Sequence, residues 1–532
     1  MNVRLAKIFA GIGDGVLMLA ALLAWWVIVM LLAGFVEIIT GWNLILTTAG
    51  GVIIALVLPI GLTIAGYILL WKRARSLPLR SVMVAGGPAG AFKLFARAIG
   101  VLFAAYLIMW GVSAVVFGAL VARQQKVLET MGLPRDWKAA MPAYQQHGNA
   151  GPLLWRVADS IKSRLPADGK SLPQLYSMLP ALSDNPDTLK YLAPLIDRLE
   201  TLNGPWLAKA DSALACTLLV WKDYRAMSID SVIAMRIPNY MGVQTLHRLY
   251  VLYAVKRAAA GDWSGCRRYF DKSNKLQSLL AQDPTLIGKM ISLVNTGTTC
   301  EGLAVIEKIQ RNRPESYALV TDVMKRMPPV DGSVRQGLVS EYSVFYGSWK
   351  SDKHSLMDVL SYTNGQMPQG RIVQLVWNTF RFTLYRLWEP WDRFCYLTAA
   401  VKGLEEASNR HYTSADDQRK NDKYYFDSLR RVPALVSAMV VPNYSGMYRR
   451  EREAITKIDV VRMFAAAIEY KRTKGNYPAT FSVLVPEYIP NVPKSAVDNS
   501  EFSYKVLPDR MLIQAKAFDG APLPKYTVIK SH

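Results

Sequence analysis

The residues that most often carry chemistry are scattered in this chain. Its five histidines stand apart in the sequence, so no HExxH or HxH metal pair exists; they are His147, His247, His354, His411 and His532. No GxSxG nucleophile elbow occurs. Adjacent acids such as Glu405 and Glu406 point in different directions on a helix and make poor acid–base pairs. The sequence therefore predicts no catalytic residue, no metal site and no cofactor.

The four cysteines, Cys216, Cys266, Cys300 and Cys395, all follow the apolar N-terminal region. No CxxC pair occurs, which argues against a zinc site or a thiol-redox site. In an oxidising compartment four cysteines allow three full pairings. Cys266 and Cys300 fall on consecutive predicted helices and are the first candidates for a disulfide. Buried free thiols are the alternative.

Aromatic and arginine side chains alternate in the stretch 377–393. Both types are enriched in binding hot spots, so this stretch is a candidate interaction patch for an acidic or carbohydrate partner. Its residues are Arg381, Tyr385, Arg386, Trp388, Trp391 and Arg393. A core helix that ends near Glu389-Pro390 would explain the same pattern.

Three apolar runs in the first quarter of the chain are long enough to span a bilayer. They cover about residues 16–39, 44–71 and 99–121, and a span requires about 20 residues. The backbone inside a bilayer must satisfy its own hydrogen bonds, so each run is predicted to be a helix. The first run is too long for a cleaved signal peptide and ends without a small-residue cleavage site.

The charges in the short loops give the direction of these spans. The N-terminal tail has Arg4 and Lys7, and the loop after the second run contains six basic residues, whereas the loop at 40–43 contains none. Basic loops stay in the cytoplasm. An odd number of spans then places everything after Val121 outside the cytoplasm. The sequence therefore predicts a bacterial inner-membrane protein whose later residues lie in the periplasm.

The segment that follows the apolar runs is basic. The full sequence carries a net charge of +22, of which +16 belongs to the 410 residues after position 122. Such a segment could attract an anionic lipid or a wall polymer, or it could be a solvated surface with a basic bias. Nucleic acid is not an expected partner, because the predicted compartment contains none.

The segment after the membrane runs is predicted to be helical. At Leu246, Leu249, Tyr250, Tyr253 and Ala254 the apolar positions follow one helix face. His247 lies beside that face, packed or solvated. The helix ends at Gly261-Asp262-Trp263, a second covers about 264–281, and Asp283-Pro284 starts a third. Helices of this length with tight turns are typical of an antiparallel, solenoid-like array.

Two segments resemble known protein groups. The stretch 244–309, with its turns GDW and QDPTLI, resembles helical-repeat regions of bacterial membrane proteins of planctomycete type, which implies an interaction scaffold. A short echo, IPNY at 237–240 and VPNY at 441–444, precedes a predicted long helix each time.

The C-terminal end is a predicted helix at 451–474 followed by a hairpin, with strands at 502–506 and 511–515 around Pro508-Asp509. The motifs GNYP at 475–478, LVP at 484–486 and YIP at 488–490 resemble the C-terminal region of type II secretion major pseudopilins. The helix is not an apolar segment at a mature N-terminus, and no prepilin cleavage site precedes it. The resemblance implies a small α+β cap and no filament assembly.

The sequence thus predicts a mainly α protein in four parts. They are a three-helix membrane anchor at 1–122, a linker with short helices at 123–173, a periplasmic helical domain at 174–450 and a helix-plus-hairpin module at 451–532. We expect a non-enzymatic scaffold or accessory subunit that binds other inner-membrane or periplasmic proteins. An envelope hydrolase acting on wall or lipid material is the alternative, and a transporter accessory subunit is a third.

Overall fold

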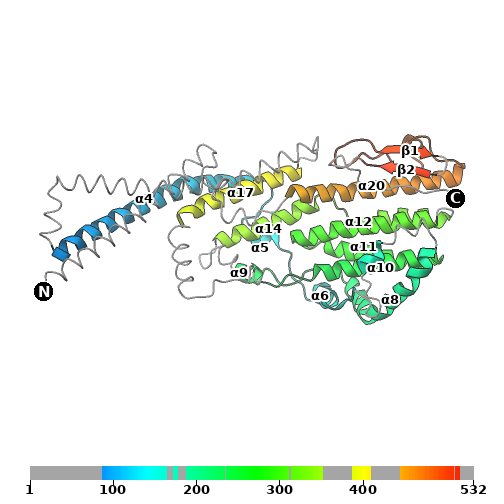
Figure 1. The fold of residues 1–532 in the computed structure, drawn as a ribbon, viewed down its shortest axis with the longest axis horizontal. Helices are drawn as coiled ribbons and strands as arrows, with labels where there is room; N and C mark the ends of the chain where they lie inside the picture. The colour runs from blue at the N-terminus through cyan, green and yellow to red at the C-terminus, as the bar shows by residue number, and fades with distance from the viewer. Residues whose placement is uncertain are drawn as a thin grey trace, which may run out of the picture. The chain divides into compact units, whose positions relative to one another are not determined.

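A computed structural model describes residues 87–163, 172–177, 187–233, 235–310, 313–350, 386–408, 444–507 and 510–515 (Figure 1). These residues are mainly helical, as the sequence predicts, and contain one two-stranded sheet. The predicted membrane runs 16–39 and 44–71 lie outside them. The chain divides into two compact units, of which the first consists of Met1–Gln125, Pro368–Thr398 and Lys423–Val441 and the second of the remaining residues.

In the first unit, the third predicted membrane run falls within one long helix, α4 (Gly87–Thr130), whose last residues belong to the second unit. Several large apolar side chains of α4 are exposed: Ile108, Trp110, Val112, Val115 and Val116. Within the described parts of the chain, no helix combines the length and the mean hydropathy of a membrane span.

The second unit begins with short helices, where prolines and polar caps interrupt the chain. Asp136 caps α5 (Trp137–Ala140) by accepting a hydrogen bond from the Lys138 N–H, and Pro152 lies in the first turn of α6 (Gly151–Ser160). The next helices are α7 (Leu172–Ser177), α8 (Asp187–Leu214) and α9 (Ile229–Ile233).

The three helices predicted from the periodicity and turns are confirmed as α10 (Tyr240–Ala259), α11 (Trp263–Leu280) and α12 (Leu286–Ile309). Each starts with a polar cap: Asn239, Asp262 and Thr285 accept from the backbone N–H three residues ahead, at 3.0, 2.8 and 3.0 Å. Gly261 has a φ of 75°, which suits glycine in the turn between α10 and α11. The three helices lie side by side (Figure 1), and the short turns make neighbours antiparallel.

Three further helices pack around α12: α13 (Pro314–Lys325), α14 (Ser333–Lys350) and α20 (Tyr444–Lys474). Helices α11, α12, α13 and α20 share a core that contains Phe270, Cys300, Leu303, Val320, Val461 and Ala465. Helices α10 and α20 both begin at the tyrosine of the IPNY and VPNY segments. The helix α17 (Arg386–Ser408) starts in the first unit and ends in the second.

The predicted hairpin is also present. Strands β1 (Ser503–Leu507) and β2 (Arg510–Gln514) pair antiparallel, with Ser503 opposite Gln514. Buried Met511 and Ile513 pack with a short helix, η3 (Phe481–Leu484), on the face of α20 that presents Met463 and Phe464.

The helix predicted from residue 451 begins earlier, at Tyr444, and contributes residues to two cores. Val461 and Ala465 belong to the helical core, whereas Val460, Met463 and Phe464 belong to the core of the cap. Helix α20 therefore packs against the helical domain on one face and against the cap on another. The boundary predicted at 122 likewise falls inside α4.

Candidate functional site

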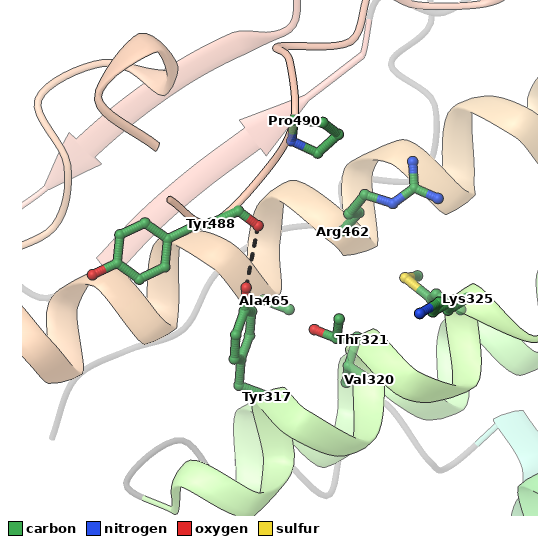
Figure 2. Close-up of a pocket in the computed structure, with 9 residues that line it drawn as sticks. Tyr317, Val320, Thr321, Lys325, Arg462, Ala465, Tyr488 and Pro490 are labelled. Atoms are coloured by element: carbon green, nitrogen blue, oxygen red, sulfur yellow. Dashed lines mark hydrogen bonds between the residues drawn. The ribbon is translucent and has the colours of Figure 1, made fainter. Parts of the chain in front are cut away.

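A pocket with a volume of about 360 Å³ opens between α13, α20 and the segment that follows η3 (Figure 2). It is lined by Tyr317, Val320, Thr321, Met324, Lys325, Arg462, Ala465, Tyr488 and Pro490. Ligand pockets in proteins cover about 300–1,000 Å³, so this one suits a small ligand.

The floor of the pocket is apolar because two helices turn their core faces toward each other there. Val320, Met324 and Ala465 are all buried and belong to the core shared by α13 and α20. Pro314 in the first turn of α13 fixes where that helix starts. Pro490 and the ring of Tyr488 come from the chain after η3.

The polar groups of the pocket lie on its edge. The Tyr317 hydroxyl donates to the Tyr488 carbonyl at 3.2 Å, which ties α13 to the cap (Figure 2). Burial raises the pKa of the half-buried Tyr317, so its hydroxyl stays protonated. Arg462 forms an ion pair with Asp459 at 3.2 Å. Burial raises the pKa of Asp459 to about 6, an effect that Arg462 opposes.

A second polar cluster is enclosed between α10, α11 and α12. His247 Nε2 lies 2.8 Å from Ser273 Oγ, 3.0 Å from Gln277 Nε2 and 3.2 Å from Thr299 Oγ1. Gln277 also donates to Thr299 at 2.8 Å. His247, Ser273, Gln277 and Thr299 are fully buried. Burial lowers the pKa of His247 to about 3, so the imidazole is neutral.

The Ser273–His247 pair has the separation of a serine nucleophile and its base, but not the surroundings. A catalytic histidine needs a third group to orient its other nitrogen, and His247 Nδ1 has no hydrogen-bond partner among the described residues. A substrate cannot reach the enclosed Ser273 hydroxyl. The cluster therefore joins three helices, and His247 is packed, which was one of the two predicted environments.

Asp283 organises a third buried polar group, at the start of α12. Its carboxylate accepts from Trp221 Nε1 at 2.6 Å, from the Tyr240 hydroxyl at 2.7 Å and from the Thr285 N–H at 2.8 Å. The Tyr240 hydroxyl also lies 2.8 Å from Thr285 Oγ1. Burial, together with the Asp283 charge, raises the pKa of Tyr240. These contacts join the N-termini of α10 and α12 to the chain after α8.

All four cysteines are free thiols in the structure, so it contains no Cys266–Cys300 bond. Cys266 and Cys300 are fully buried in one core cluster, the environment expected for buried free thiols. Burial raises the pKa of each thiol to about 12. Both are protonated at neutral pH and poor nucleophiles.

The predicted interaction patch is described only in part. Arg381 and Tyr385 lie outside the described residues, and Arg386 and Trp388 start α17. The half-buried ring of Trp391 lies edge-on to Phe117 at 4.9 Å, and Arg393 forms an ion pair with Glu389 at 2.8 Å. Trp391 and Arg393 therefore have partners within their own unit, as side chains of a packed helix do. A role of the patch in binding stays a prediction.

Sequence reasoning missed the pocket at α13 and α20. Its residues come from three separate segments, and none stands in a motif typical of a binding site. The only signal was YIP at 488–490, which marked a cap and not a site. Across the described ranges, no group of three His, Cys, Asp or Glu side chains could hold a metal ion.

Comparison with known proteins adds no further identification. No protein-family model, curated protein or solved structure matches the chain. The resemblances to planctomycete-type membrane proteins and to the pseudopilin C-terminal region therefore stay predictions.

Proposed function

We propose that this chain is a membrane-anchored scaffold, an accessory subunit of an envelope complex in a bacterial inner membrane. Its apolar N-terminal helices hold it in the bilayer, and its helical domain faces the periplasm and binds partner proteins. The described cores of that domain are built from its own helices.

One observation carries the anchor. On α4, Ile108, Val112 and Val115 are 67%, 58% and 73% exposed. A helix of a water-soluble domain buries such residues, since each contributes roughly 1.5–3 kcal/mol when removed from water. They lie in the uncharged run 99–121, so hydrocarbon is an environment that suits both the exposed side chains and the sequence.

The scaffold role is supported by exposed apolar side chains at the end of the helical array where α10 and α12 begin. Met241 on α10 and Ile287 on α12 are 63% and 46% exposed. They flank the Tyr240–Thr285 hydrogen bond, so both lie at the same end of the array. Exposed apolar side chains that gather at one place often mark a protein contact.

The topology predicts a specific effect of charge in α4. Replacing Val112 and Val115 by lysine adds about 2.5–3.5 kcal/mol each to the apparent cost of inserting the third span. An even number of spans would then leave the C-terminus in the cytoplasm. A C-terminal alkaline phosphatase fusion, active only outside the cytoplasm, should lose activity in this double variant.

The matched control replaces Val483 and Val506, which are 44% and 47% exposed in the cap, by lysine. That variant should keep the fusion active. If the α4 variant also keeps full activity, or if the unaltered chain gives none, the proposed topology is wrong. The scaffold role is tested separately by native mass measurement after gentle detergent extraction, where a lone monomer would count against it.

A further inference from the structure

The pocket between α13 and α20 combines an apolar floor with a cationic edge. Its floor residues Val320, Met324 and Ala465 are no more than 6% exposed. Its edge has Lys325 from the last turn of α13 and Arg462 from the middle of α20 (Figure 2). None of the nine lining residues is acidic. The floor therefore suits the apolar part of a ligand, and the edge suits an anionic group.

The donors around the pocket select the charge of the ligand. The Tyr488 carbonyl already accepts from Tyr317, and the Tyr488 hydroxyl lies 2.7 Å from Thr473 Oγ1. The charged groups left on the edge, the Lys325 ammonium and the Arg462 guanidinium, are donors only. Their natural counterpart is an acceptor that carries negative charge.

The amount of charge on the edge favours a monoanion. Asp459 pairs with Arg462 at 3.2 Å and compensates its charge. Lys325 adds one positive charge on the opposite helix. The sum is close to a single uncompensated positive charge, which suits a carboxylate better than a doubly charged phosphate ester.

We propose that this pocket binds a small amphipathic carboxylate, an aromatic ring or short alkyl chain with one carboxylate group. The apolar body lies against Val320, Met324 and Ala465, and the carboxylate lies between Lys325 and Arg462. The site is separate from the surfaces assigned to membrane and partner contacts, so it is tested independently of the scaffold role.

The test uses the purified full chain and 2-naphthoate as the probe, with binding followed by isothermal titration calorimetry. A ligand of this size is expected to bind one per chain with a Kd of about 0.1–1 mM. The Lys325→Glu variant should weaken binding by roughly three- to tenfold, because it reverses one exposed charge at the edge. Thr321→Phe, which fills the pocket from an exposed position, should abolish it.

Lys474→Glu is the matched control, because Lys474 is also exposed in the last turn of its helix but does not line the pocket. It should leave the Kd unchanged. The uncharged probe 2-naphthalenemethanol should bind at least several-fold more weakly than 2-naphthoate. Equal binding of the two probes, the same Kd for Lys325→Glu and the unaltered chain, or no binding of 2-naphthoate would each overturn the proposal.

Discussion

The buried carboxylate of Asp283 is expected to be the most sensitive single position in the helical domain. It is fully buried, and it accepts from Trp221 Nε1 at 2.6 Å and from the Tyr240 hydroxyl at 2.7 Å. Replacing it by alanine leaves the Trp221 N–H without a partner in a place that water does not reach. The Tyr240 hydroxyl keeps its contact with Thr285 Oγ1 at 2.8 Å and is therefore affected less.

The size of this effect follows from the groups that lose partners. A buried donor without an acceptor costs about 1–3 kcal/mol, and loss of a helix-start contact, here at the Thr285 N–H, costs about 1 kcal/mol. Asp283→Ala should therefore destabilise the α10–α12 region by roughly 2–4 kcal/mol, a large part of the typical 5–15 kcal/mol of a domain. Tyr240→Phe removes one donor and leaves the carboxylate three others, the Trp221 Nε1–H, the Thr285 N–H and the Thr285 hydroxyl. It should cost only about 1 kcal/mol.

Native-state hydrogen exchange with mass spectrometry measures this effect in the full chain, peptide by peptide. In Asp283→Ala, peptides from α10 and α12 should exchange about one to three orders of magnitude faster, since 1.4 kcal/mol corresponds to a factor of ten. The control is Asp159→Ala, which breaks a pair with the exposed Arg236 and should change exchange little. Protection in Asp283→Ala within threefold of the unaltered chain would refute the assigned role of the carboxylate.

Two other positions give independent checks. Burial raises the pKa of Glu307 to about 8. The folded chain therefore holds this proton more tightly than the unfolded chain. The free energy of unfolding should fall as pH rises from about 4.5 to 8, by at most about 1.4 kcal/mol per pH unit. Glu307→Gln should remove that share of the slope in melting temperature against pH, and an unchanged slope would show that the carboxyl is ionised in the fold. A Cβ on Gly242 would lie 1.9 Å from the Ala158 carbonyl oxygen, so Gly242→Ala should destabilise the fold by about 1–3 kcal/mol. Gly204 in α8 has open space around it, so Gly204→Ala should stabilise the fold by up to about 1 kcal/mol. Equal melting temperatures for the two alanine variants would contradict the close packing of α6 against α10.

The elements that the sequence predicts well are those whose signals are local. The turn at Gly261 needs a left-handed residue, Asp262 and Thr285 are side-chain caps, and Pro508-Asp509 separates two short alternating segments. Each of these features depends on a few neighbouring residues. The limits of α10, α11, α12 and the hairpin therefore lie close to their predicted positions.

The features that the sequence does not predict depend on contacts between distant segments. Helix α20 starts at Tyr444, seven residues before the predicted start at 451. Its residues belong to two cores, and a single apolar stripe in the sequence does not reveal this. His247 stands in no recognisable motif, and its partners Ser273 and Thr299 come from two other helices. The pocket at α13 and α20 forms in the same way, so no periodicity could have revealed it.

The claim on which the functional account rests is that apolar helices hold this chain in a bilayer. The most direct measurement is extraction of cell membranes with alkaline carbonate, followed by flotation of the pellet on a density gradient. We expect the full chain to resist extraction and to float with the lipid. Recovery of the intact chain in the carbonate supernatant would contradict the anchor, and with it the periplasmic placement of the helical domain.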